Sequence, residues 1–132
     1  MSAQGLRVLP SRHGAVETLE RLEAIIVRQG MTVVARIDHG AAAEKVGLDL
    51  RPTVVVFFGN PRAGTPAMQA TPTIAIDLPL RMLIWQDEKG TWLGYNDPKW
   101  LAKRHDALVG TDRALGAMTD VLAVVAKEAT EA

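Results

Sequence analysis

Two kinds of hydrophobic spacing follow one another in the N-terminal part of the chain. From Ala15 to Ile26, apolar side chains recur at three- and four-residue spacing, and Gly30 follows, so the pattern predicts an amphipathic helix. A short apolar piece, Leu6 to Leu9, precedes it, and Ser11 is expected to cap the helix. From Met31 to Asp38 the period changes to two, which predicts a half-buried strand.

The middle of the chain carries several strand patterns. Thr53 to Phe58 is almost wholly apolar, which predicts a central strand covered on both faces, or on one face plus a dimer partner. Thr73 to Leu78 alternates again and predicts a strand that Pro79 interrupts. Arg81 to Gln86 and Thr91 to Tyr95 flank a polar turn with a glycine, so they predict a β-hairpin.

Further helices are predicted around these strands. Ala41 to Val46 is expected to form a short helix, Asp97-Pro98 starts another that carries Trp100, and Asp112 is expected to cap the last. Because a tight turn joins consecutive strands, the sheet is at least partly antiparallel and the fold class is α+β. We expect a single domain over residues 1–132, with a core of about 5–127. Its order would be β-α-β(4)-α, with the helices packed on one face of a mainly antiparallel sheet.

Composition narrows the classes of function. The 15 basic and 15 acidic side chains cancel, so no net charge favours nucleic acid or an anionic membrane. The absence of cysteine excludes disulfides, a thiolate nucleophile and cysteine-ligated metals. No apolar run approaches the roughly 20 residues of a membrane span, and no signal peptide is expected. We therefore expect a cytoplasmic protein that binds neither membrane nor nucleic acid.

The stretch VVVFFGNPRAGTP has the glycine spacing of a phosphate-binding loop. Gly59 and Gly64 match GxxxxGK[ST], but Thr65 stands where the lysine would be and Pro66 where the magnesium-binding hydroxyl would be. Pro61 also removes one backbone donor. We expect instead a shaped turn, with Thr65 capping a helical turn that begins at Pro66.

Four polar side chains are candidates for binding a ligand. Asn60 and Arg62 would bind a carboxylate or phosphate, or would only build the turn. Asp77 and Arg81 would orient a ligand, with Asp77 as a general base; the alternative is that Asp77 bonds nearby backbone or pairs with an arginine.

Histidines and aromatic residues give weaker signals. The three histidines have no ligand-like spacing, so we expect neither a metal nor a cofactor. Trp85 and Trp92 lie on opposite arms of the hairpin, where cross-strand packing is favourable. They would line a ligand pocket, contact a dimer partner or pack in the core against a helix.

With these residues in view, the chain resembles the family known as domain of unknown function 302, over roughly residues 5 to 127. The most specific features are four short motifs: Gly59 to Pro61, Ala70 to Pro72, Leu78-Pro79, and Tyr95 to Pro98. The resemblance implies a fold similar to the TATA-box-binding protein and association as homodimers. It implies no catalytic residues. Many members have a cysteine after the Leu-Pro motif, where this chain has Leu80.

Three functions remain open from the sequence. The first is a small homodimer that binds a small polar or anionic organic ligand through Asn60, Arg62, Asp77 and Arg81. The second is an enzyme that uses Asp77 as an acid or base, with Arg62 or Arg81 holding substrate charge. The third is a regulatory or structural interaction module whose hairpin aromatics form the contact surface.

Overall fold

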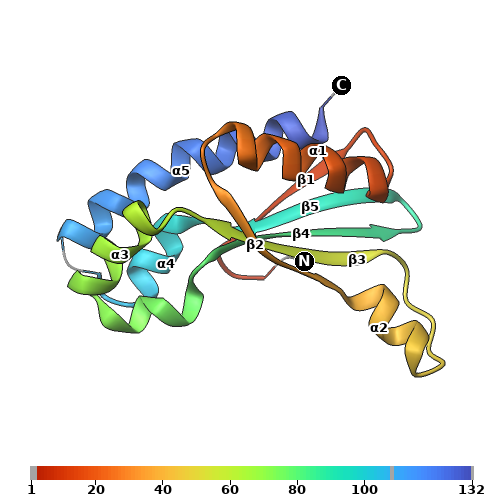
Figure 1. Ribbon diagram of the computed structural model, residues 1–132, viewed down its shortest axis with the longest axis horizontal. Coiled ribbons are helices and arrows are strands. Elements are labelled where there is room, and N and C mark those ends of the chain that lie inside the picture. Colours follow the sequence, from red (N-terminus) through yellow and green to blue (C-terminus); the bar gives the residue numbers. More distant parts are fainter. Residues whose placement is uncertain (1–2, 108, 132) are drawn as a thin grey trace.

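A single antiparallel sheet of five strands, in the order β1-β5-β4-β3-β2, forms the centre of the molecule (Figure 1). The computed structural model describes residues 3–107 and 109–131. The strands are β1 (Leu6–Ser11), β2 (Thr32–Asp38), β3 (Thr53–Gly59), β4 (Leu80–Asp87) and β5 (Gly90–Asn96). The predicted α+β class is confirmed, as is the hairpin, which β4 and β5 form.

The helices occupy three places around the sheet. They are α1 (Ala15–Arg28), α2 (His39–Lys45), α3 (Pro61–Ala70), the short 3-10 helix η1 (Pro72–Asp77), α4 (Pro98–Arg104) and α5 (Val109–Thr130). Figure 1 shows α1 and α5 side by side on one face of the sheet. It also shows α3, η1 and α4 gathered at one end, while α2 projects from the other.

The main hydrophobic core lies between the sheet and the helix pair α1 and α5. Alternate residues of β3, β4 and β5 point into it and meet one apolar stripe from each helix, as period-two and helical spacing require. Fully buried side chains include Leu22, Ile26, Val56, Phe58, Met82, Ile84, Leu93 and Val125. Burial of each stabilises the fold by about 1.5–3 kcal/mol. A second cluster joins α3, η1 and α4 to α5 through Ala67, Ile74, Leu101, Ala102 and Leu115.

The predicted cap of the first helix is wrong. The N-cap of α1 is Gly14, which makes no side-chain cap bond. Ser11 is the last residue of β1, and its hydroxyl bonds to Thr18 Oγ1 at 2.7 Å and accepts from the His13 amide at 3.2 Å. Ser11 therefore links the end of β1 to the first turn of α1 without being the N-cap of that helix. The cap predicted at Asp112 lies outside the described side chains; α5 begins at Val109.

The strand predicted from Thr73 to Leu78 is the 3-10 helix η1 instead. Ile74 is fully buried, whereas Ile76 is 71% exposed, so the two do not share a strand face as alternation requires. The turn is closed by the Ile74 amide, which donates to the Thr71 carbonyl at 3.0 Å. Pro72 occupies the first position, which suits a helical start.

Helix α3 begins five residues earlier than the sequence predicts, at Pro61 instead of Pro66. Its N-cap is Asn60, whose Oδ1 accepts from the Arg62 amide at 2.9 Å. Pro61 takes the first helical position, where a missing N–H costs nothing. Thr65 is therefore no cap, and Pro66 lies inside the helix.

Candidate functional site

The four polar side chains predicted to bind a ligand each have a different local setting. Asn60 caps α3, and Arg62 lies exposed in the first turn of that helix. Arg81 lies on β4, with its guanidinium 4.7 Å from the centroid of the Phe57 ring and Nη2 donating to the Pro79 carbonyl at 3.3 Å. Asp77 lies at the end of η1 and belongs to a different cluster.

Asp77 accepts two short hydrogen bonds from the end of α4. Arg104 Nη1 and His105 Nε2 both lie 2.6 Å from its Oδ2, and the other His105 nitrogen lies 3.0 Å from Thr73 Oγ1. Partial burial acts to raise the pKa of Asp77, but the bonds from His105 and Arg104 and their charge outweigh it, so the pKa is lowered. A carboxylate held ionised is a weak base, and its donors fasten η1 to α4.

A pocket of about 440 Å³ lies where β3 ends and α3 begins. Its walls come from the edge strand β2, from α3, from the Leu78-Pro79 segment before β4 and from α5. The lining residues are Thr32, Val34, Gly59, Asn60, Pro61, Gly64, Thr65, Met68, Leu78, Pro79, Leu80 and Met118. We call this the α3 pocket. Of the four predicted ligand residues, Asn60 lines it, whereas Asp77 lines neither this pocket nor the groove described below.

The amide groups at the start of α3 are already bonded within the chain. The Arg62 amide is taken by the Asn60 side chain, and the amides of Ala63 and Gly64 donate to the Asn60 carbonyl at 2.9 and 3.0 Å. Pro61 has no N–H to offer. A phosphate cradle needs free N–H groups that converge on the anion, so this loop does not provide one.

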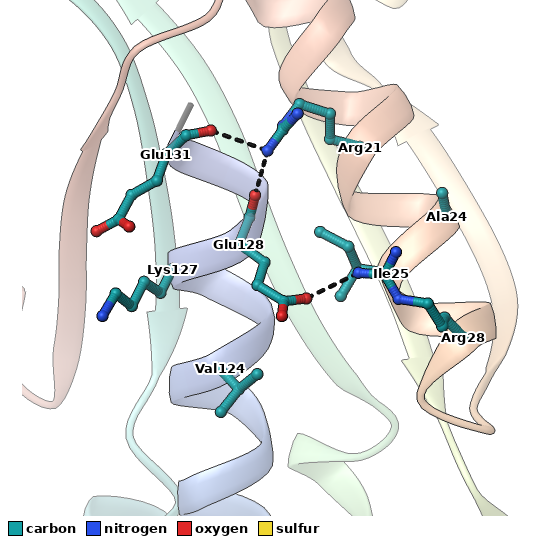
Figure 2. A pocket seen from close by; sticks show the side chains of 8 residues that line it. All are labelled: Arg21, Ala24, Ile25, Arg28, Val124, Lys127, Glu128 and Glu131. Atoms are coloured by element: carbon teal, nitrogen blue, oxygen red, sulfur yellow. Dashed lines mark hydrogen bonds and ion pairs between the residues drawn. The ribbon is translucent and has the colours of Figure 1, made fainter.

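A larger groove of about 610 Å³ lies between α1 and α5 (Figure 2). Arg21 lines this groove, and its Nη2 donates to the carbonyls of Glu128 and Glu131 at 2.7 and 2.8 Å. Its Nε donates to the Ala129 carbonyl at 3.3 Å. Arg28 pairs with the Glu128 carboxylate at 2.9 Å. Arg21 thus satisfies the last carbonyls of α5, which is a structural role.

The face of the sheet opposite α1 and α5 is largely apolar. One row of cross-strand neighbours crosses all five strands on this face: Ile37, Val55, Leu83, Gly94 and Val8. A parallel row holds Trp85 directly opposite Trp92. The two ends of the first row, Val8 and Ile37, are 39% and 44% exposed. We call this surface the open face.

The positions of the hairpin tryptophans exclude one of the three roles that the sequence allows for them, packing in the core. Trp85 and Trp92 pair across β4 and β5 as expected, but they point away from α1 and α5, so they do not pack in the core against a helix. Trp92 Nε1 donates to Asp87 Oδ1 at 3.0 Å, which satisfies its polar end.

Neither a metal cluster nor a membrane-spanning helix occurs in residues 3–107 and 109–131. Within these ranges, no group of three His, Asp or Glu side chains gathers as a metal site would require. Over the same part of the chain, no helix is both long enough and apolar enough to cross a membrane.

The sequence does not reveal the α3 pocket, and it allows an arginine partner for Asp77 without identifying Arg104 or His105. The glycines at 59 and 64 are a signal for the pocket, but their spacing also fits a phosphate loop or a shaped turn. Arg104 and His105 lie 27 and 28 residues from Asp77 along the chain, and no local pattern links them to it.

Comparison with known proteins supports the same fold. The chain resembles the crystal structure of the uncharacterized conserved protein DUF302 from Bacillus stearothermophilus, with a TM-score of 0.86 and 20% sequence identity. The match covers 96% of this chain and 99% of that one. At this identity the likeness establishes the fold.

Closer sequence relatives are longer proteins. The fluoride-specific ion channel FluC 1 of Brucella suis biovar 1 (strain 1330) is 47% identical over 126 residues, which cover 95% of this chain and 50% of that protein. FluC 1 of Brucella abortus biovar 1 (strain 9-941) is equally similar, with 47% of its length covered. The chain therefore spans about half the length of these relatives. The model of the family described as domain of unknown function DUF302 matches residues 8–125, and the chain belongs to that family.

Proposed function

We propose that the chain is a homodimeric binding domain: two copies associate through their open faces, and each copy holds a small ligand in its α3 pocket. The observation that carries the proposal is the open face itself. Its apolar row runs from Ile37 to Val8 with Leu83 near the middle, and neither α1 nor α5 covers it. Water contact along such a surface is unfavourable, and contiguous apolar patches of this kind mark interaction sites.

A second copy is the occupant that this surface fits best. The row presents aliphatic side chains with few charges, so the same patch on two molecules is self-complementary, as a two-fold contact requires. The arm formed by α2 adds apolar surface beside it, since Val46 and Leu48 are 71% and 65% exposed and α2 itself has no buried residue. Contact with a second copy would bury both the apolar row and the apolar surface near α2, and would remove their side chains from water.

Sedimentation of a charged variant tests the association. Leu83→Lys places an ammonium group in the middle of the apolar row, where a second copy would have to desolvate it. We expect the wild-type chain to sediment with twice the mass of one chain and Leu83→Lys with the mass of one. Val16→Lys is the control, because Val16 is exposed on α1, and it should stay dimeric. A monomeric wild-type chain would refute the proposal.

The ligand site of each copy is the α3 pocket in this proposal. Its volume of about 440 Å³ lies in the range of small-molecule sites, and Asn60 stands at its rim. Asp77 and Arg81 are engaged elsewhere, by Arg104 and His105 and by Phe57. A small-molecule screen followed by thermal unfolding tests it, because a ligand that binds only the folded chain raises the unfolding temperature.

The Brucella relatives support a second proposal about the partner. Two proteins named as fluoride-specific ion channels contain a region 47% identical to this chain, and about half of each lies outside that region. We propose that this domain associates with a fluoride channel, joined to it in those relatives. The half of the B. suis protein outside the match, expressed alone, should retain this chain on an affinity column. The proposal fails if it does not. Loss of retention in Leu83→Lys would assign the open face to the channel in place of a second copy.

A further inference from the structure

We infer that the α3 pocket takes an aliphatic chain with one polar head group, and that Gly59 and Gly64 keep the pocket open for it. This inference rests on the proposed function of the pocket as a ligand site. It replaces the polar or anionic ligand that the sequence predicts with one of different chemistry.

The backbone does not require glycine at either position. The glycines with positive φ in the described chain are Gly5, Gly30, Gly47 and Gly90, so Gly59 and Gly64 have backbone angles open to other residues. Gly64 lies inside α3, where glycine is the poorest helix former after proline. Conformational freedom therefore does not account for glycine at these two sites.

Both glycines lie in the wall of the pocket. A Cβ added to Gly64 would lie 4.0 Å from both Leu78 Cδ1 and Met68 Cε, which is ordinary contact distance with two walls of the pocket. A Cβ added to Gly59 would lie 3.7 Å from Pro79 Cβ, on a third wall. A Cβ would fit at either position, and because it would face side chains that line the pocket, we expect a longer side chain to extend into the pocket. The space that longer side chains would take at Gly59 and Gly64 thus belongs to the pocket.

The chemistry of the walls selects an aliphatic ligand. The apolar side chains of the lining are those of Val34, Pro61, Met68, Leu78, Pro79, Leu80 and Met118, of which Val34 and Pro61 are exposed. None of the described lining residues is aromatic or charged, so the pocket offers no ring to stack on and no ion to pair with. The two methionines are flexible and polarizable, which suits a chain that adopts several conformations.

The polar groups of the pocket are at its rim. Thr32, Asn60 and Thr65 line it and are exposed, and the amide groups at the start of α3 are already bonded, as described above. A head group would therefore meet hydroxyl and amide groups at the mouth and remain in contact with water. Arg62 follows the lining residues Asn60 and Pro61 in the chain and is exposed, so we expect its positive charge to favour a carboxylate head group at the mouth.

Decanoic acid at submicellar concentration is the test probe, with succinate and inorganic phosphate as polar comparisons. Thermal unfolding of the full chain would be followed with each probe for wild type, Gly64→Leu and Gly116→Leu. We expect the side chain of Gly64→Leu to occupy part of the pocket and obstruct it. Gly116→Leu is the matched control, because it makes the same change on a helix where an added Cβ meets nothing within 4 Å.

We expect decanoic acid to raise the unfolding temperature of wild type and Gly116→Leu saturably, and its apparent affinity for Gly64→Leu to fall by at least about tenfold. Without ligand, Gly64→Leu should unfold at the wild-type temperature or above it, because leucine favours the helix. If Gly64→Leu fails to fold, Val34→Trp obstructs the same pocket from an exposed position on β2 and should have the same effect on binding.

The other outcomes separate this inference from the proposed function. If succinate or phosphate stabilises the chain, decanoic acid does not, and Gly64→Leu abolishes the effect, the pocket is a ligand site but its ligand is polar, and the inference is wrong. If decanoic acid binds Gly64→Leu and wild type equally well, its binding site lies outside the α3 pocket, and the inference is also wrong. If no probe binds, both the inference and the proposed ligand site fail.

Discussion

The six-membered ring of Trp85 lies close to Gly94 on the open face of the sheet. A Cβ added to Gly94 would lie 3.0 Å from Trp85 Cζ3 and 3.4 Å from Cη2, so the ring occupies the space that any other residue would fill. Gly94 also belongs to the apolar row, between Leu83 and Val8. The glycine therefore leaves room for a large aromatic ring beside the apolar row.

Gly94→Val should weaken self-association. The valine side chain would push the Trp85 ring off the sheet and leave a raised, poorly matched surface. We expect the dimer dissociation constant to rise by about tenfold or more, which corresponds to about 1.4 kcal/mol. Sedimentation equilibrium gives the constant, and the tryptophan emission should move to longer wavelength as the ring becomes wetter. An unchanged dissociation constant would show that the ring over Gly94 plays no part in the contact.

Asp77→Asn should destabilise the chain in a pH-dependent way. The folded-state pKa of Asp77 is lowered, so its stabilising effect is present above the unfolded-state pKa and is lost as the pH falls through the folded value. We expect Asp77→Asn to lower the free energy of unfolding by about 1–2 kcal/mol near pH 7. The difference from wild type should shrink below about pH 4. Urea unfolding at several pH values measures it; a difference that persists unchanged at about pH 2 would contradict this role.

Arg21→Met should loosen the C-terminal end of α5. Methionine keeps an apolar stem reaching from α1 toward α5 but cannot donate to the carbonyls of Glu128, Ala129 and Glu131. We expect a loss of about 1–3 kcal/mol in stability and faster amide exchange in the last turn. Arg28→Met is the control, because Arg28 pairs with an exposed carboxylate, and it should cost less than about 1 kcal/mol. Equal effects of the two changes would exclude the capping role.

Asn60→Ala should destabilise the start of α3 at the rim of the pocket. The variant leaves the Arg62 amide without its side-chain acceptor, which costs about 1 kcal/mol. Asn60→Asp keeps an acceptor in the same place and should retain the wild-type stability. Thermal unfolding of both variants measures the difference. If alanine and aspartate behave alike, the side-chain bond contributes nothing to the helix.

The parts of the fold that the sequence predicts well are those where local spacing and burial agree. The helix from Ala15 has one apolar stripe and one sheet to cover, and the hairpin around Asp87 has alternating arms joined by a glycine turn. The segment from Pro72 to Asp77 has the same alternation, yet Ile74 enters the second core cluster while Ile76 faces solvent. Tertiary packing determines the conformation of that segment, and the hydrophobic period alone does not predict it.

The candidate site was less predictable because it depends on contacts between distant segments. Asn60 lines the α3 pocket, but its side chain bonds to the adjacent helix start, and the pocket is completed by Leu78 and Met118 from elsewhere in the chain. For Asp77 the sequence allows a polar pair with Arg81 on a strand or, as the alternative, a bond to nearby backbone or a pair with an arginine. A 3-10 helix turns the carboxylate toward Arg104 and His105, so the pair with an arginine is the alternative that the structure shows.

The open face as the contact between two copies is tested most directly by thiol labelling, because the chain has no cysteine of its own. Ile37 on the open face and Val124 on α5 are 44% and 45% exposed in the single chain, so cysteines placed there would label alike in a monomer. Val8 and Val121 form a second matched pair, at 39% and 37%. We expect Ile37→Cys and Val8→Cys to react far more slowly than Val124→Cys and Val121→Cys, and to become equally reactive when Leu83→Lys is added. Equal labelling rates within each pair in the otherwise wild-type chain would contradict the proposed dimer.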